Sequence, residues 1–395
     1  MKRMKMKGIK FFSAIVLLTV IFACNNHNSS EQSDFSQLSN VKFEKDKPFK
    51  EFLENVRQYY KLPAIAAAVV TSDSVLHLDV VGMNNTKDNL KIGDNALFNI
   101  GSCAKSLTSL LVAKLIEQGY LDWDTQLLEV IDLDKEVIDK TYNKITVIDL
   151  LSHSSGFHQY SSDEDFFSIS NKIPELTGSI INKRNQFVIW NCLNAKPLEK
   201  GEFHYSNGGY VAVASMLESI TEKTWEVLID DEILKPLELN SAKIGFAQEL
   251  DTNQPWRHLG RDSNGYGIPL PSEQREIPDL FNPAGNISMS IRDFAKYAQF
   301  HLQCLFESNE TFINSELVKK LHKITVNVSE NESYGLGWSI SFFNGEKVSA
   351  HSGGDQSTYA IIAIDYNLRK AWVIMTNIGD SNAEIACGNI IMEMQ

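Results

Sequence analysis

Residues 64–81 read AIAAAVVT-SDS-VLHLDVV, two apolar runs rich in small and β-branched residues with three polar residues between them. This pattern predicts a β-hairpin with strands at Ala64–Thr71 and Val75–Val81. Similar runs return near the C-terminal end of the chain. Four further strands are predicted there, at Tyr334–Phe343, Lys347–His351, Thr358–Asp365 and Ala371–Asn377.

Helical patterns flank and separate these strands. Apolar residues recur at helical spacing over 48–61 and 383–394, and the stretch of roughly 100–320 is mainly helical, with irregular loops near 254–286. Strands from both ends can share one sheet if the middle is an insertion. We therefore expect an α/β (α+β) fold with an antiparallel sheet built from both chain ends, flanked by helices, and not a parallel βαβ sheet.

The N-terminus reads as an export signal. Residues 1–23 carry five cations and no anion, and their apolar run, 11–23, is too short to span a bilayer. The run ends Ile-Phe-Ala-Cys24, which resembles the lipobox of bacterial lipoproteins, so Cys24 is the predicted lipidation site. Ordinary signal cleavage near Cys24 is the alternative. Either way we expect an exported protein, and lipidation predicts a periplasmic or cell-surface lipoprotein anchored to a bacterial membrane.

The remaining chain divides simply. A polar segment, 24–48, is predicted to be a flexible tether, and residues 49–395 are predicted to form one folded domain. The net charge of −13 argues against nucleic acid as a partner. Four further cysteines are widely spaced and read as buried thiols, although an oxidising compartment would permit one bridge. No ligand spacing for a metal is evident and no cofactor is predicted; the oligomeric state is left open.

Ser102-Cys103-Ala104-Lys105 is the first motif that carries chemistry. Apolar residues at helical spacing follow it, so Ser102 lies where a helix begins and free N–H groups favour negative charge. Lys105 lies on the same helical face. A lysine among apolar neighbours gives up its proton more readily and could accept the serine proton. The plain alternative is a serine N-cap; a second Ser-x-x-Lys match, Ser39 with Lys42 in the tether, shows how weak the pattern is alone.

Tyr205-Ser206-Asn207 is the second motif, and it precedes a helical run at 209–221. The Tyr205 hydroxyl could relay a proton to a leaving group, and the Asn207 amide could bind a substrate amide. Taken alone, the motif reads better as Asn207 capping a helix with Tyr205 packed beneath it.

His351-Ser352-Gly353 is the third motif and closes a predicted strand, whose edge could pair with an extended peptide-like substrate. The stretch around Ser352 nearly matches the Gly-x-Ser-x-Gly elbow of α/β-hydrolases. That fold needs a histidine after the nucleophile, and none follows Ser352. The elbow interpretation therefore fails.

With these motifs in this order, the chain resembles the serine β-lactamase-related family: class C β-lactamases, D-alanyl-D-alanine carboxypeptidases, D-aminopeptidases and related esterases. The resemblance runs from about residue 49 to the end. It extends to the stretches 145–156 (ITVIDLLSHSSG), 203–210 (FHYSNGGY), 283–286 (PAGN) and 334–338 (YGLGW).

The resemblance implies a β-lactamase/transpeptidase-like fold with Ser102 as acylated nucleophile and Lys105 and Tyr205 sharing general-base and general-acid work. It also implies an oxyanion hole formed by the backbone N–H groups of Ser102 and Gly354. Asn207 and the strand His351-Ser352-Gly353-Gly354 would bind substrate. Class C enzymes have lysine where this chain has His351, which resembles the peptidase branches. A histidine would carry only part of a positive charge for an anionic substrate.

We expect a serine hydrolase that cleaves an amide or ester, with D-amino-acid peptides as the leading substrate class and peptidoglycan-like peptides, esters or lactams as its small-molecule partners. One alternative is a penicillin-binding sensor that acylates with little turnover. Others are a β-lactamase or esterase with a different acyl substrate, or a scaffold without activity, which the retention of all three motifs disfavours.

Overall fold

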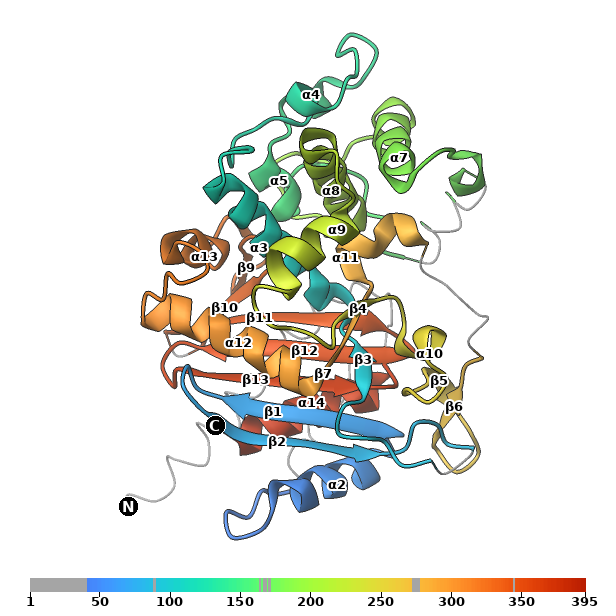
Figure 1. The fold of residues 1–395 in the computed structure, drawn as a ribbon, viewed down its shortest axis with the longest axis vertical. Helices are drawn as coiled ribbons and strands as arrows, with labels where there is room; N and C mark the ends of the chain where they lie inside the picture. Colours follow the sequence, from blue (N-terminus) through green and yellow to red (C-terminus); the bar gives the residue numbers. More distant parts are fainter. Residues whose placement is uncertain are drawn as a thin grey trace.

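A central antiparallel sheet carries the fold (Figure 1). The computed structural model describes residues 41–87, 90–162, 165, 169, 172–271, 278–343 and 345–395. Its largest sheet has the strand order β2-β1-β13-β12-β11-β10-β9-β8, with antiparallel pairings throughout, which confirms the predicted fold class. The strands are β1 (Ala64–Val70), β2 (Val75–Gly82), β8 (Val326–Asn327), β9 (Glu332–Tyr334), β10 (Ser339–Phe343), β11 (Glu346–Asp355), β12 (Thr358–Asp365) and β13 (Lys370–Thr376).

The two ends of the chain meet at β1 and β13. Ile65 lies opposite Thr376 and Val70 opposite Ala371. All residues of β1 are buried, and alternate side chains enter separate cores on the two faces of the sheet. A strand covered on both faces has no polar side, which explains the continuous apolar run in the sequence.

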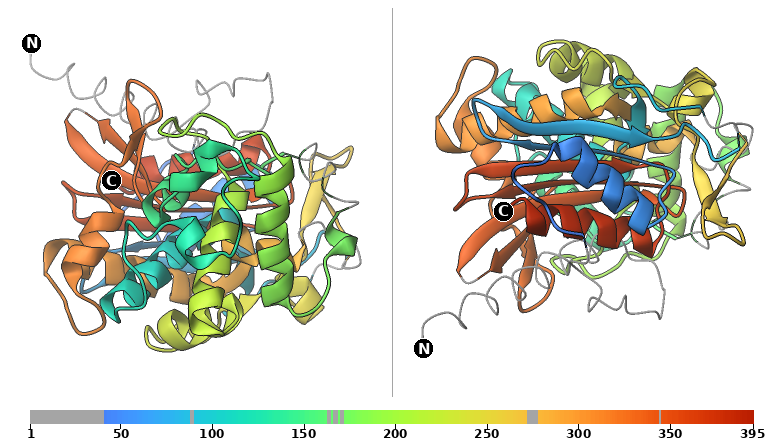
Figure 2. Two further views of the ribbon diagram at one scale, coloured as in Figure 1. Left: turned by 90° about the horizontal axis from the view of Figure 1, so that it is seen from above. Right: turned by 90° about the horizontal axis from the view of Figure 1, so that it is seen from below.

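One face of the sheet is covered by helices from the two chain ends, α2 (Phe49–Tyr59) and α14 (Ser381–Glu393). Figure 2 shows both helices against this face when the molecule is seen from below. The apolar side of α2 packs into the same core as α14. Asp380 caps α14 by accepting a hydrogen bond from the Ala383 N–H, which marks where the helix begins.

The opposite face carries α3 (Ala104–Glu117), α12 (Ile291–Phe306) and the rest of the middle region. The other helices there are α4 (Leu127–Val130), α5 (Val147–Leu151), α7 (Ile180–Asn194), α8 (Asn207–Thr221), α9 (Trp225–Ile229), α10 (Ala247–Leu250), α11 (Asn282–Gly285) and α13 (Ser315–Leu321), with short turns η2 (Gly101–Cys103), η3 (Lys140–Lys144), η4 (Ile173–Glu175), η5 (Asp230–Leu234) and η6 (Asp279–Phe281). Two small sheets, β3 (Leu97–Asn99) with β7 (Ile287–Ser290) and β4 (Lys243–Ile244), and β5 (His258–Arg261) with β6 (Gly267–Pro269), were not predicted.

Two strand predictions needed correction. Of the run predicted as one strand over 334–343, only Tyr334, the last residue of β9, and β10 are strand. The residues between them form a turn in which Gly337 has a left-handed φ of 81°. The strand predicted to close at His351 continues to Asp355. The third motif therefore lies inside β11 and not at its end.

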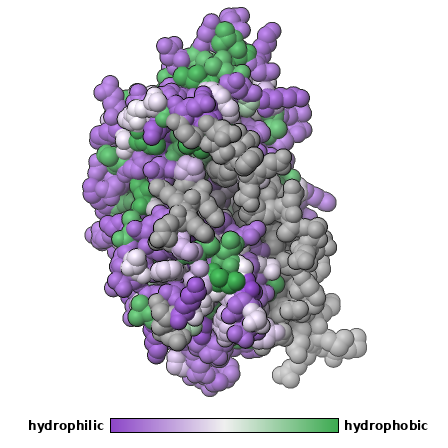
Figure 3. All heavy atoms as spheres, turned by 90° about the vertical axis from the view of Figure 1, so that its right-hand side faces the viewer, coloured by the Kyte–Doolittle hydropathy of each residue, from purple (hydrophilic) through white to green (hydrophobic). Residues whose placement is uncertain are grey.

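Hydrophilic side chains predominate on the face shown in Figure 3, with hydrophobic ones in small groups. Cys103, Cys192, Cys304 and Cys387 are buried and form no disulfide with one another, which confirms the thiol prediction. Within the described ranges, no helix has the length and apolar content needed to cross a membrane. The predicted signal peptide, Cys24 and residues 25–40 of the tether lie outside the described residues.

Candidate active site

The predicted nucleophile lies on a tight turn, η2, that leads directly into α3. Gly101 has a φ of +49°, and a Cβ there would lie 2.2 Å from the Gly354 nitrogen. A Cβ on Gly353 would lie 2.2 Å from the Ser102 nitrogen. Only glycine allows this approach, so these residues let β11 press its backbone against the turn that carries Ser102.

Lys105 connects two of the three motifs. Its Nζ donates to Ser102 Oγ at 3.0 Å, to Asn207 Oδ1 at 2.7 Å and to the Ala284 carbonyl at 2.6 Å. Lys105 is fully buried. Three acceptors match the three N–H groups of an ammonium, so the hydrogen bonds fix the direction of the amine toward the serine.

Tyr205 is brought to the same point. Its ring centroid lies 4.8 Å from the Lys105 Nζ, and that of Tyr210 lies 5.5 Å away. Tyr205 is 4% exposed, and the neighbouring His153 ring packs on it at 4.4 Å between centroids. The structure thus places Ser102, Lys105 and Tyr205 together, as proposed; their roles in catalysis stay a prediction.

Asn207 is the first residue of α8, and Ser206 caps the helix by accepting from the Gly209 N–H. The N-cap alternative for Asn207 is therefore wrong by one position. Besides accepting from Lys105, Asn207 donates from Nδ2 to the Tyr160 carbonyl at 2.7 Å. Its amide orients the lysine, and because Nδ2 has a second N–H, contact with a substrate amide stays a prediction.

His351 departs from expectation. Burial, with a contribution from Lys105, lowers its pKa to about 3. Its Nε2 lies 2.9 Å from the Tyr334 hydroxyl and its Nδ1 lies 2.6 Å from the Ser352 carbonyl. A carbonyl only accepts, so Nδ1 carries the proton and Nε2 accepts from Tyr334. Burial and the low pKa argue against the prediction that His351 supplies partial positive charge to an anionic substrate.

The substrate-binding prediction for β11 rests on its edge. β10 pairs with β11 only as far as Ala350, whereas β12 pairs with it to Asp355. Among the described residues, the segment 351–355 therefore has a strand partner on one side. The face of the sheet on which a Gly353 side chain would lie contacts the nucleophile turn. Ser352 and Gly354 lie on this segment, where an extended substrate could add hydrogen bonds.

Several residues in the site were not assigned roles from sequence. The Ala284 carbonyl holds Lys105, but a backbone acceptor has no side-chain signal. His153 accepts from the Ser206 N–H at Nδ1 (3.0 Å) and has a left-handed φ of 61°. Burial and Lys105 hold its pKa well below the usual range. Its place in the stretch 145–156 was the only available signal.

In the part of the chain that the structure describes, no group of three or more His, Cys, Asp or Glu could hold a metal ion. The side chains gathered around Ser102 offer a hydroxyl, an amine and a phenol, and backbone N–H groups lie beside them.

Comparison with known proteins gives one family match. The sequence model of the beta-lactamase family matches residues 49–387. The curated relatives include Protein flp of Staphylococcus aureus (strain MW2), which is 23% identical over 333 residues covering 82% of this chain. The alignment spans 62% of the length of that relative.

Solved structures with the same fold include two that are similar over most of this chain. The octameric penicillin-binding protein homologue from Pyrococcus abyssi has a TM-score of 0.70 at 23% identity, covering 87% of this chain and 76% of its own. The D-stereospecific amidohydrolase from Streptomyces sp. has a TM-score of 0.63 at 18% identity, covering 84% of this chain and 97% of its own.

Proposed function

Since the chain belongs to the beta-lactamase family, we propose that it is an exported, lipid-anchored serine hydrolase that cleaves an amide or ester through an acyl-enzyme on Ser102. D-amino-acid peptides are the leading substrate class. The observation that carries the proposal is the contact of 3.0 Å between the Lys105 Nζ and the Ser102 Oγ, with the Tyr205 ring beside the amine.

In the proposed reaction, Ser102 Oγ attacks the substrate carbonyl and its proton passes to the pair Lys105 and Tyr205. For this pair to act as a base, it must hold one proton fewer than an ammonium plus a phenol when attack begins. The pair then returns the proton to the departing amine or alcohol, which leaves an ester on Ser102. Water cleaves that ester by the same proton transfers in reverse and releases the acid.

The negative oxygen of the tetrahedral intermediate needs fixed donors. We assign this role to the backbone N–H groups of Ser102 and Gly354, whose segments are in contact through Gly101 and Gly353. Loss of one such donor typically costs about 10²–10³ in rate.

The neutral state of His351 supports a preference among substrates. A lactam whose binding depends on a fixed positive charge near its carboxylate receives none from this ring at pH 7. Peptides and esters that hydrogen-bond along 351–355 do not need that charge. The name of the structurally similar D-stereospecific amidohydrolase agrees with this choice.

The test is an acylation and turnover panel on the purified chain: a labelled penicillin, a chromogenic cephalosporin, short-chain p-nitrophenyl esters, and D- and L-configured dipeptide amides. We expect one adduct on Ser102 by intact mass and peptide mapping, and faster hydrolysis of the D-peptides than of their L-isomers. Ser102→Ala is the control and should give neither. An active wild-type protein without a Ser102 adduct from any of these probes would reject the mechanism.

The same panel separates the alternatives. A penicillin adduct that persists for hours without product would indicate a sensor. Rapid opening of the cephalosporin with no action on D-peptides would indicate a β-lactamase instead.

A further inference from the structure

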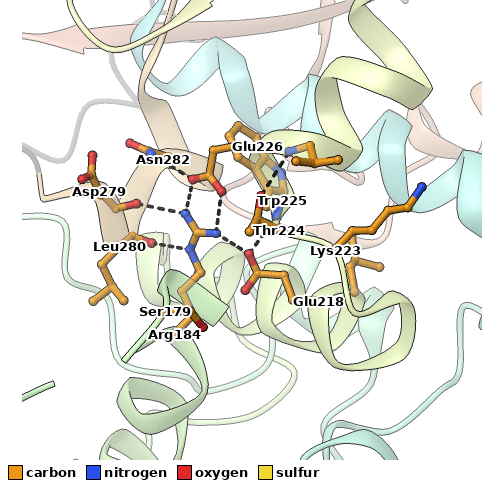
Figure 4. A network of polar contacts seen from close by, with 12 residues as sticks. Ser179, Arg184, Glu218, Lys223, Thr224, Trp225, Glu226, Asp279, Leu280 and Asn282 are labelled. Carbon is orange, nitrogen blue, oxygen red and sulfur yellow. Dashed lines mark hydrogen bonds and ion pairs between the residues drawn. The ribbon is translucent and has the colours of Figure 1, made fainter. Parts of the chain in front are cut away.

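A second buried polar cluster lies on α7, α8 and α9, outside the motifs (Figure 4). Arg184 is fully buried and donates to Glu218 from Nη1 and to Glu226 from Nη2, the latter at 2.5 Å. Burial raises the pKa of Glu218. Burial also acts to raise the pKa of Glu226, but the hydrogen bonds and the charge of Arg184, together with a hydrogen bond from Asn282, outweigh burial and lower the pKa. The cluster is therefore a guanidinium between two glutamates, one with a raised pKa and one with a lowered pKa.

The same guanidinium also binds the backbone that leads to α11. Its Nη2 donates to the Asp279 carbonyl at 3.0 Å and its Nε to the Leu280 carbonyl at 3.2 Å. Glu226 Oε1 in turn accepts from Asn282 Nδ2 at 3.0 Å. Arg184 therefore holds Asp279 and Leu280 directly and Asn282 through Glu226, as the contacts drawn in Figure 4 show.

That stretch continues into the active site. Two residues after Asn282, the Ala284 carbonyl accepts from the Lys105 Nζ at 2.6 Å. The Pro283 carbonyl accepts from Thr108 Oγ1 on α3 at 2.8 Å. One short segment thus connects the Arg184 cluster to the helix that carries the catalytic amine.

A second path runs through asparagine side chains. Asn286 donates to Asn282 Oδ1 at 2.8 Å, and Asn99 donates to Asn286 Oδ1 at 3.5 Å. Asn99 Oδ1 then accepts from the Gly101 N–H at 2.9 Å, one residue before Ser102. All three asparagines are buried. Hydrogen bonds therefore connect both the Lys105 amine and the turn that carries Ser102 to the same segment, 282–286.

We propose that Arg184 is a positioning residue for acyl transfer: by clamping 279–282 it sets the Ala284 carbonyl, and through it the direction of Lys105 toward Ser102. This inference rests on the proposed function. A planar five-donor guanidinium is suited to hold two carbonyls and two carboxylates at once, which the compact ammonium of lysine cannot do. Small displacements of reacting groups reduce rate more than binding, because attack needs defined geometry.

The experiment compares Arg184→Lys with wild type in steady-state hydrolysis of an activated ester and in single-turnover acylation of Ser102. We expect kcat and the acylation rate constant to fall about tenfold while KM changes by less than about twofold. Asn282→Leu serves as the second variant, because it removes the Glu226 contact of the first path and the Asn286 link of the second while the guanidinium stays in place, and it keeps the test valid if Arg184→Lys does not fold. We expect the same split from it.

Arg57→Lys is the matched control. Arg57 is also a buried arginine that forms a bidentate pair with a glutamate, Glu54, and holds a carbonyl, that of Leu62 at 2.9 Å. It lies on α2, across the sheet from the site. We expect it to lower thermal stability and leave kcat unchanged.

Wild-type kcat in folded Arg184→Lys and Asn282→Leu would overturn the positioning role and leave a structural one. A wild-type protein that no ester or lactam acylates would instead overturn the proposed function, and this inference with it.

Discussion

The fold buries two basic side chains, Arg184 and Lys105, and surrounds them with different kinds of acceptor. Arg184 is held by two carboxylates and two carbonyls. Lys105 donates to three neutral oxygens, from a hydroxyl, an amide and a carbonyl. The two histidine rings that act on the lysine site, His153 and His351, are neutral, since burial lowers their pKa.

We infer from this difference in partners that Arg184 contributes mainly to stability and Lys105 mainly to reactivity. The carboxylates beside a guanidinium balance its positive charge, so the guanidinium has little electrostatic effect outside the cluster. Removing it leaves buried negative charge without a partner. An amine surrounded by neutral oxygens keeps its field for whatever charge develops on Ser102. The following predictions test whether the two sites differ in this way.

The largest expected effect is on acylation. Lys105→Met should lower the rate of Ser102 acylation by at least about 10³-fold, because the variant loses both the proton-transfer group and the nearby positive charge. Intact mass after timed exposure to an activated ester measures it. Acylation at more than a tenth of the wild-type rate would mean that the amine is not part of the machinery.

Stability should respond in the opposite way. Arg184→Met leaves the buried Glu218 beside the half-buried Glu226 with no cation between them, and we expect it to cost about 3–5 kcal/mol of unfolding free energy. Lys105→Met removes a buried cation and fills its volume, so its stability should equal or exceed wild type. Urea denaturation of the two variants measures the contrast. Equal losses in both would show that the two cations serve the same purpose.

A smaller change makes the lysine site resemble the arginine site. Asn207→Asp places a carboxylate on Lys105, which favours the charged amine and neutralises its field. We expect acylation to fall about 10–100-fold, equal to about 1.4–2.7 kcal/mol of barrier, with the adduct still on Ser102. Single-turnover kinetics measures this, and Asn207→Ala, which adds no charge, is the control. A faster reaction in the aspartate variant would contradict the contrast.

The smallest effect, counted for one group and one pH unit, concerns the pH dependence of stability. Burial lowers the pKa of His351 and His301 to about 3 and that of His258 to about 4. An unfolded histidine titrates near about pH 6.5, so the unfolded chain binds protons that the folded one does not. The stability is complete above that pH and falls as pH drops toward the folded values, by at most about 1.4 kcal/mol per pH unit for each histidine.

Urea midpoints at pH 7.5, 6.0 and 5.0 measure this slope. His351→Gln should reduce the slope of stability against pH by the contribution of one histidine. In the wild-type protein, the KM for substrate should not change between pH 5.5 and 8. A KM that improves for anionic substrates below about pH 6.5 would restore the charged role that the structure rejects.

The sequence allowed much of the fold to be predicted where a short pattern determines a local structure. The hairpin at 64–81 and the strand Thr358–Asp365 appear with nearly the predicted bounds, because alternation and turn residues act within a few positions. The run 334–343 was mispredicted because Gly337 makes a turn only when its backbone packs against α3, which no local pattern reveals. The two small sheets were missed because their strands have at most four residues.

In the candidate site, too, some features could be predicted from the sequence and others depend on tertiary packing. Residue types and order, together with the family resemblance, predicted Ser102, Lys105 and Tyr205 as the nucleophile, amine and phenol of the site, because these side chains are chemically distinctive and lie in a recognisable order. Their catalytic roles stay a prediction. Only the tertiary structure decided the charge of His351, the Ala284 carbonyl as the partner of Lys105, and the connection to Arg184. Each of these depends on burial or on backbone atoms brought together from distant parts of the chain, and neither property is written in the residue types.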